Sequence, residues 1–258
     1  MNLSTIPNWL ATLPKSVVDT QRPSGASAVL LVCEHASRLI PEGLKGLGLD
    51  DTAAQSHIAW DPGALAVAER LSEALDATLI AQKISRLVYD CNRPPESDQA
   101  MRAESEVFHI AGNTGLTQAQ RDERTDYIYR PFRQALAEAV KTRAQTVLVT
   151  IHSFTPVYNG APRAVEVGIL HDSDRKLADA MLKAAAKNPK YNVQRNLPYG
   201  PEDGVTHTLQ EHAVAHGLPN VMIEVRNDLL ADSAGVEAVA TWLESLLTSA
   251  LENLDGES

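Results

Sequence analysis

Two histidines and two carboxylates stand at or just beyond the ends of short apolar runs, where they could do chemistry. They are His35, Asp61, His152 and Glu224. Two histidines and one carboxylate are a common ligand set of a catalytic zinc, which keeps a further position for water. Zinc lowers the pKa of that water and polarises a carbonyl, and a second carboxylate can pass the water's proton to a leaving nitrogen. This pattern favours zinc-assisted hydrolysis of an amide, with one zinc per chain.

The carboxylate ligand of such a site could be Asp61 or Glu34. Glu34 and His35 are adjacent, so in a regular strand they point to opposite faces, which favours Asp61. Asp61 also precedes Pro62 at the start of a periodic segment, the pattern of a helix N-cap followed by proline at the first helical position. Capped strand ends with hydrogen-bonded histidines are the alternative to a metal site. No HExxH motif is present.

Arginines near these residues could bind an anionic substrate. Arg226 lies two residues after Glu224, on the same face of a strand, and could clamp a carboxylate. A second polar group comprises Arg86, Asp90, Asn92 and Arg93. Arg86 or Arg93 could bind substrate, or could hold Asp90 in a structural ion pair.

Other polar residues could contact the metal ligands, rather than the metal itself, and hold them in place. These are Glu34, His57, Asp90 and Ser153. His207, His212 and His216 fall on one predicted helix, and the last two could share a metal. No third ligand accompanies them, so an exposed or capping role is favoured.

Apolar strands alternate with helical segments along the chain. Strands are predicted at 28–33, 78–82, 84–91, 146–151, 164–170, 191–194 and 220–225. Helices are predicted at 50–56, 61–75, 118–144, 172–187, 206–216 and 234–251, with a bend at Pro131. This alternation predicts an α/β fold, a three-layer sandwich with a mostly parallel central sheet and helices on both faces. Ligands of such sheets bind beyond the carboxyl ends of the strands.

The 258 residues carry a net charge of −10 and show no basic stripe. Nucleic acid and membrane surfaces are therefore not expected partners, whereas a small anionic substrate needs only one or two well-placed arginines. We expect a single domain over 1–258, with an N-terminal arm at 1–25 and a lid loop at 94–117, since a loop of that length is usually functional.

No signal peptide or membrane span is recognisable, and the two cysteines are expected to be buried free thiols. A cytoplasmic location is expected.

Several motifs resemble the N-formylglutamate amidohydrolase family. They are CEHAS, HIAWDPGA, SRLVYDCNRP, IHSFTPVYNG, VEVGIL, NLPYG and VMIEVRNDLL, in that order across 28–230. The resemblance implies hydrolysis of N-formyl-L-glutamate to formate and glutamate, a step associated with histidine degradation. It also implies a fold similar to the zinc carboxypeptidases and muramoyl amidases. By position, His35, Asp61 and His152 correspond to the zinc ligands and Glu224 to the proton shuttle.

The sequence CEHAS departs from the Pro-His-Ser-Gly-like motif of the deformylases that it resembles, which leaves the exact acyl group and amino acid open. Two other functions remain. One is an amidase acting on a peptide or cell-wall fragment, which a wide open groove would favour. The other is a non-catalytic protein that binds a small anion, which has no need of a proton shuttle such as Glu224.

Overall fold

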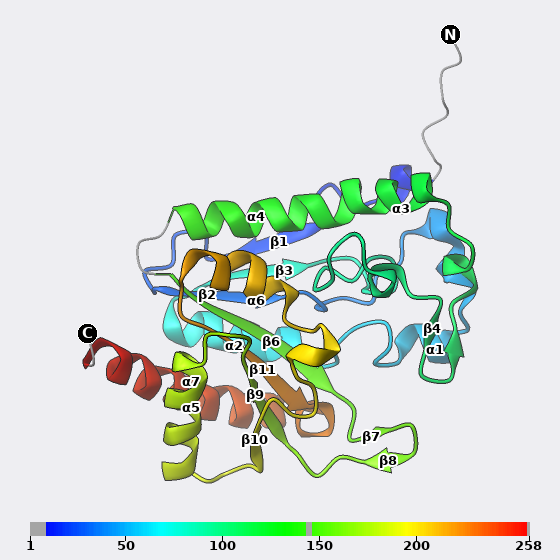
Figure 1. Ribbon diagram of the computed structural model, residues 1–258. Helices are drawn as coiled ribbons and strands as arrows, with labels where there is room; N and C mark the ends of the chain where they lie inside the picture. Colours follow the sequence, from blue (N-terminus) through cyan, green and yellow to red (C-terminus); the bar gives the residue numbers. More distant parts are fainter. Residues whose placement is uncertain (1–8, 143–145, 257–258) are drawn as a thin grey trace.

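A seven-stranded sheet forms the centre of the computed structural model, which describes residues 9–142 and 146–256 (Figure 1). Its strands are β1 (Val18–Gln21), β2 (Val29–Cys33), β3 (Thr78–Gln82), β6 (Val147–Phe154), β9 (Val167–Leu170), β10 (Val193–Arg195) and β11 (Asn220–Arg226). They lie in the order β1-β3-β2-β6-β11-β9-β10. The core strands β3, β2, β6 and β11 are parallel, while β1 and the β9–β10 pair run against their neighbours. The predicted, mostly parallel α/β sheet is confirmed.

Helices cover both faces of the sheet. They are α1 (Asp51–Gln55), α2 (Ala64–Leu75), α3 (Gln118–Arg124), α4 (Arg130–Lys141), α5 (Lys176–Lys187), α6 (His207–His212) and α7 (Ser233–Gly256). Short 3-10 turns lie at Leu10–Thr12, Glu42–Gly48, Asp98–Met101, Ala111–Asn113, Pro201–Asp203, Val214–His216 and Asn227–Leu230. In Figure 1, α4 (green) lies along one side of the sheet and α7 (red) along the other. None of the helices in the described part of the chain is long and apolar enough to span a bilayer.

Alternation along the buried strands separates two hydrophobic clusters. Leu31 of β2 packs in one cluster with the apolar residues of α2, α5 and α7, and Leu30 packs in the other with those of α4 and α6. Both side chains are fully buried. Because successive strand residues point to opposite faces, a continuous apolar run can be buried on both sides, as the sequence predicts for β2.

The predicted strand at 84–91 is wrong. Side chains replace the sheet ladder there: Gln82 Oε1 accepts the backbone N–H groups of Lys83 and Ile84. Ser85 Oγ donates to Ala59 O at 2.7 Å and accepts the N–H of Leu87. Side-chain bonds of this kind compete with regular structure, so the chain turns although its residues have strand propensity.

Other boundaries also differ from the sequence predictions. Part of the predicted arm at 1–25 is the edge strand β1, which pairs antiparallel with β3, and residues 1–8 lie outside the described residues. The predicted helix at 118–144 runs from Gln118 to Lys141, and residues 143–144 lie outside the description. A π-helical turn, Thr125–Tyr129, interrupts it just before Pro131, where the ring has no N–H to offer the helix.

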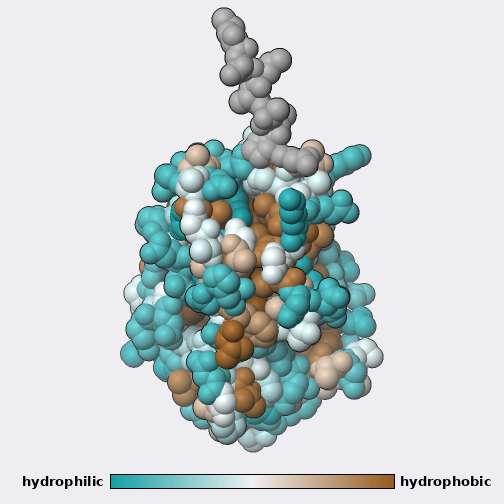
Figure 2. Space-filling view, turned by 90° about the vertical axis from the view of Figure 1, so that its right-hand side faces the viewer, coloured by the Kyte–Doolittle hydropathy of each residue, from teal (hydrophilic) through white to brown (hydrophobic). Residues whose placement is uncertain are grey.

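The segment 94–117 has little regular secondary structure. It contains the hairpin of β4 (Glu104–Ser105) and β5 (Phe108–His109) between two 3-10 turns. A second hairpin, β7 (Val157–Tyr158) and β8 (Ala161–Pro162), follows β6 at the right of Figure 1. Figure 2 views this side of the molecule, whose surface is mainly hydrophilic with hydrophobic patches near its centre. Closure of the segment 94–117 as a lid stays a prediction.

Candidate active site and metal centre

Neighbouring parallel strands bring the candidate residues together. His35 follows β2, His152 lies in β6, and Glu224 lies in β11 directly beside His152 in the register. Because β2, β6 and β11 are adjacent and parallel, their carboxyl ends meet at one edge of the sheet. Asp61, in the loop before α2, reaches the same edge and donates its backbone N–H to His35 O at 3.0 Å.

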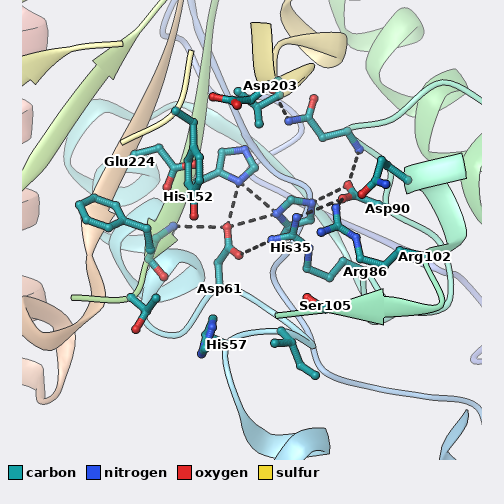
Figure 3. A pocket seen from close by; sticks show the side chains of 18 of the residues that line it. His35, His57, Asp61, Arg86, Asp90, Arg102, Ser105, His152, Asp203 and Glu224 are labelled. Atoms are coloured by element: carbon teal, nitrogen blue, oxygen red, sulfur yellow. Dashed lines mark hydrogen bonds and ion pairs between the residues drawn. The ribbon is translucent and has the colours of Figure 1, made fainter. Parts of the chain in front are cut away.

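His35, Asp61 and His152 form the one buried group in the described residues that could hold a metal ion (Figure 3). His35 Nδ1 lies 3.2 Å and His152 Nδ1 2.9 Å from Asp61 Oδ2, and the two ring nitrogens lie 3.2 Å apart. Ligand atoms around a tetrahedral zinc, each about 2.0–2.1 Å from the ion, lie about 3.3 Å from one another. The three atoms therefore converge with the spacing that such an ion requires.

The outer nitrogen of each histidine faces another carboxylate. His35 Nε2 lies 2.7 Å from Asp90 Oδ1, and His152 Nε2 lies 3.1 Å from Glu34 Oε2. Carboxylates behind metal-binding histidines orient the rings and raise their basicity. Glu34 thus lies behind His152, and Asp61 is the carboxylate beside both inner nitrogens.

Several buried polar atoms here have no well-aligned hydrogen bond within the described residues. They are both oxygens of Glu34, His152 Nε2 and Glu224 Oε2. Burial opposes charge on His152, but Glu34 and Asp61 raise its pKa well above the ordinary value. Burial likewise opposes charge on Glu34, but His152 lowers its pKa. Unsatisfied buried groups are rare in native proteins. His152 Nε2 and Glu34 Oε2 face one another at 3.1 Å, whereas the unpaired oxygen of Glu224, which lines the cavity, fits a bound water or cation.

Asp61 does not cap a helix, contrary to the sequence prediction. Helix α2 starts only at Ala64, and the carboxylate instead accepts the N–H of Ser153 at 3.3 Å. Gly63, at φ +81°, makes the turn, and a Cβ there would lie 2.4 Å from Leu230 Cβ. The tight turn leaves the carboxylate of Asp61 free to face the histidines.

Glu224 lies buried in the wall of the same cavity. Burial raises its pKa to about 7, with Asp61 adding to the rise and His152 opposing it. A carboxyl group that titrates near neutrality is well suited to exchange protons at physiological pH. The position and pKa of Glu224 therefore fit the predicted proton shuttle.

Three arginines surround Asp90 at the other end of the cavity. Arg86 lies 3.1 Å from Asp90 Oδ2 and bridges to Asp61 Oδ1, also at 3.1 Å. Arg102 and Arg93 lie 3.6 Å and 3.9 Å from the same Asp90 oxygen. We call these three arginines the arginine end of the cavity, and His35, Asp61 and His152 the histidine end. Asp90 joins the two.

The cavity has a volume of about 330 Å³ and contains both ends together with Glu224. This volume is near the lower limit of small-molecule sites. Figure 3 shows the labelled side chains converging from the strand ends and from the segment 94–117.

One protein family matches most of this chain. The sequence model of the N-formylglutamate amidohydrolase family matches residues 27–231. The chain belongs to this family. The resemblance predicted from the motifs is thereby confirmed, and the chain is a member of a hydrolase family.

Two solved structures resemble this family member. A gene product of Agrobacterium tumefaciens shares 52% sequence identity, with a TM-score of 0.91 over 93% of this chain and 96% of that one. The N-formylglutamate amidohydrolase of Ralstonia eutropha shares 19% identity, with a TM-score of 0.59 over 93% of this chain and 99% of that one. The second likeness shows the shared fold. No curated protein matches the chain.

Most of the predicted site residues of this family member line the cavity, but Arg226 and Glu34 do not. Arg226 pairs with Asp228 at 2.8 Å and with Glu166 at 3.4 Å. Asn92 lines the cavity, but its side chain accepts the N–H of Thr208 and so holds the start of α6.

His57 and Ser153 both lie at the cavity. His57 pairs with Glu106 of the segment 94–117 at 3.0 Å. Ser153 Oγ donates to Pro62 O at 2.8 Å, which fastens the turn that carries Asp61 to β6. His57 therefore reaches across the mouth of the cavity rather than contacting the ligands.

Sequence reasoning missed Arg102 and Tyr199, which also line the cavity. Tyr199 belongs to the family-like motif NLPYG, and Arg163 donates to its hydroxyl at 3.0 Å. Burial raises the pKa of Tyr199 to about 12, so the hydroxyl keeps its proton near neutrality. Arg102 had no signal, because the segment 94–117 shows no periodicity and no motif.

Proposed function

We propose that this protein is a zinc-dependent amidohydrolase that cleaves the amide of an N-acyl acidic amino acid, N-formyl-L-glutamate above all, to formate and glutamate. The observation that carries the proposal is the histidine end: two histidines backed by carboxylates converge with Asp61 next to Glu224. Membership of the N-formylglutamate amidohydrolase family supports the choice of substrate.

The proposed ligands are His35, Asp61 and His152. Zinc bound there would supply a water molecule of lowered pKa and polarise the substrate carbonyl. The set of two nitrogens and one oxygen is among those that zinc takes in hydrolases. Asp90 and Glu34 keep the two rings oriented through their outer nitrogens.

Glu224 moves the proton in this proposal. It takes a proton from the attacking water while the oxygen bonds to the carbonyl carbon. It then gives that proton to the amine nitrogen as the carbon–nitrogen bond breaks. Its pKa of about 7 lets it accept and release the proton without a large driving force in either direction.

The arginine end holds the substrate's charge. Guanidinium groups bind carboxylates through two parallel hydrogen bonds, and three of them line this cavity. The volume of about 330 Å³ suits a small acyl amino acid better than a peptide or a cell-wall fragment. A protein that only bound an anion would have no use for Glu224.

Metal content tests the proposal. Wild type and the variant His216→Ala, which changes an exposed histidine outside the site, should each carry about one zinc per chain and release formate from N-formyl-L-glutamate. His35→Ala and His152→Ala should lose both the metal and turnover, because each removes one of only three ligands. N-formyl and N-acetyl forms of glutamate and aspartate then identify the acyl group and amino acid.

A folded wild-type protein that takes up no metal after zinc is supplied would contradict the zinc mechanism. Metal retained in both site variants would place the metal elsewhere. Loss of zinc from His216→Ala would instead favour the histidines of the 206–216 region.

A further inference from the structure

Arg102 is a cavity residue to which the proposed mechanism gives no separate role. It follows the 3-10 turn Asp98–Met101, at the start of the irregular part of the segment 94–117. Its side chain is 21% exposed and lines the cavity beside Asp90. A guanidinium so nearly removed from water needs acceptors for its hydrogen-bond donors.

Most of the N–H donors of the Arg102 guanidinium have no acceptor in the described part of the chain. A guanidinium carries five N–H donors. In the described part of the chain, Arg102 has a single ionic partner, Asp90 Oδ2, at 3.6 Å from its NH2 nitrogen. That oxygen already has Arg86 at 3.1 Å, and the other oxygen of Asp90 lies 2.7 Å from His35. Asp90 therefore cannot satisfy Arg102.

The two neighbouring arginines have closer contacts than Arg102, although Arg93 Nε is buried without a hydrogen-bond partner in the described residues. Arg86 spans two carboxylates, Asp61 and Asp90, and these raise its pKa in spite of burial. Arg93 donates to Asp203 O at 2.8 Å. Burial and Arg86 instead lower the pKa of Arg102 to about 10, only partly opposed by Asp90. Within the described residues, Arg102 is thus the one of the three arginines whose guanidinium has no polar contact shorter than 3.6 Å.

The remaining carboxylates at this end of the cavity are already engaged. Asp203 accepts the backbone N–H of Gly200 at 2.9 Å. Glu106 pairs with His57 at 3.0 Å. An anion that enters the cavity would therefore meet Arg102 with no ion pair to displace except the 3.6 Å contact with Asp90.

Arg102 also lies at the right end of the cavity for the substrate's side chain. Figure 3 shows Glu224 and Arg102 on opposite sides of the histidine end, with Asp90 between His35 and Arg102. An amide held beside Glu224 keeps its α-carboxylate close by, whereas the carboxylate of a glutamate side chain extends farther. Arg86, which contacts Asp61 directly, lies nearer the reacting end.

We infer that Arg102 binds the side-chain carboxylate of the substrate and thereby selects an acidic over a neutral N-acyl amino acid. This inference rests on the proposed function, because it takes an N-acyl amino acid as the ligand. Arg102 is then a specificity-determining residue carried by the segment 94–117. Two of its N–H groups would pair with the two carboxylate oxygens.

Binding to a catalytically silent protein tests this inference separately from turnover. The zinc-loaded Glu224→Gln protein is titrated calorimetrically with N-formyl-L-glutamate and N-formyl-L-glutamine, which differ in one charged group. Adding Arg102→Gln should weaken binding of the glutamate compound about 10- to 100-fold, the range for a hydrogen bond to a charged group. Binding of the glutamine compound should change by less than about threefold on the same scale.

Two further variants control the measurement. Arg121→Gln removes an arginine that donates to Ser97 O of the same segment but does not line the cavity, and it should leave the preference for glutamate intact. Arg102→Lys keeps the charge without the planar fork, so it should retain part of the preference and fold even if Arg102→Gln does not.

Each outcome separates the inference from the proposed function. An equal loss for both ligands, or a preference unchanged in Arg102→Gln and Arg102→Lys, overturns the role of Arg102. If wild type hydrolyses N-formyl-L-glutamate while the preference persists in both variants, the function stands and the inference fails. If wild type binds the glutamate compound through Arg102 but does not hydrolyse it, the inference stands and the function fails.

Discussion

The two ends of the cavity distribute charge in opposite ways. At the histidine end, Glu34, Asp61 and Asp90 surround two imidazoles. At the arginine end, three guanidinium groups lie around the carboxylate of Asp90, and within the described residues only Arg86 pairs with a second carboxylate.

This difference shows what each end can bind. Carboxylates gathered around imidazole nitrogens favour a cation, whereas guanidinium groups gathered at one place favour an anion. A substrate that carries a reactive carbonyl and a carboxylate would meet a cation at one end and arginines at the other. The contrast predicts which substitutions change chemistry and which change binding.

Glu224→Gln should have the largest effect of the three that follow. Removing a general acid–base group typically costs about 10²- to 10⁴-fold in rate. We expect kcat to fall by that factor while zinc content stays unchanged, because Glu224 lies outside the group of converging ligand atoms. Steady-state kinetics on N-formyl-L-glutamate and metal analysis of the same sample measure both quantities.

Glu166→Gln is the matched control, since Glu166 pairs with Arg226 outside the cavity. Its kcat should match wild type. Normal turnover in Glu224→Gln would remove Glu224 from the mechanism.

Asp90→Asn should affect both ends at once, with a smaller effect. The amide keeps the size of the carboxylate but loses the charge that faces His35 and the three arginines. Loss of a partner behind a metal ligand typically weakens metal binding about 10- to 100-fold, and competition with a chelator of known affinity measures it. Asp203→Asn, which changes another cavity carboxylate, should keep its zinc. Equal affinity in Asp90→Asn and wild type would show that Asp90 serves the arginines alone.

His212 offers a contrast that should produce the smallest effect. It is buried on α6, and burial lowers its pKa to about 4, whereas Glu34 and Asp61 raise that of His152 despite similar burial. Between about pH 6.5 and 4, His212 is protonated in the unfolded chain but not in the folded protein. The free energy of unfolding therefore falls as the pH drops through this range. Between pH 7 and 5.5 the loss should be about 1 kcal/mol.

Urea unfolding at several pH values measures this loss, and His212→Gln should reduce the slope of stability against pH. The exposed His216 supplies the control His216→Gln, which should keep the wild-type slope. A slope unchanged in His212→Gln would mean that His212 is protonated with an ordinary pKa in the folded protein.

Three of the predicted site residues share one property: each lies near or just beyond the end of a strand. His35, His152 and Glu224 follow or end continuous apolar runs, and β2, β6 and β11 do form adjacent parallel strands. The parallel sheet then brings them together without further information. The geometry also favours Asp61 over Glu34 beside the histidines, as alternation along the strand suggested.

Residues outside regular elements were harder to place. The run 84–91 has strand propensity, yet Gln82 and Ser85 divert its backbone into turns. Arg226 has the right spacing from Glu224, but as the last residue of β11 it pairs with Asp228 and Glu166 instead of facing the cavity. Period and spacing describe ideal strands, and they lose meaning where side chains bond to the backbone or the strand ends.

The sequence by itself determined the layered α/β fold, the strand ends that carry His35, His152 and Glu224, and the family. Hydrophobic periodicity encodes these features because each depends on a local pattern of buried residues. Only the tertiary structure decided that Asp90 joins the two ends of the cavity and that Arg102 enters it. Those contacts join irregular segments far apart along the chain, where the pairing of charges depends on burial and distance that no local pattern records.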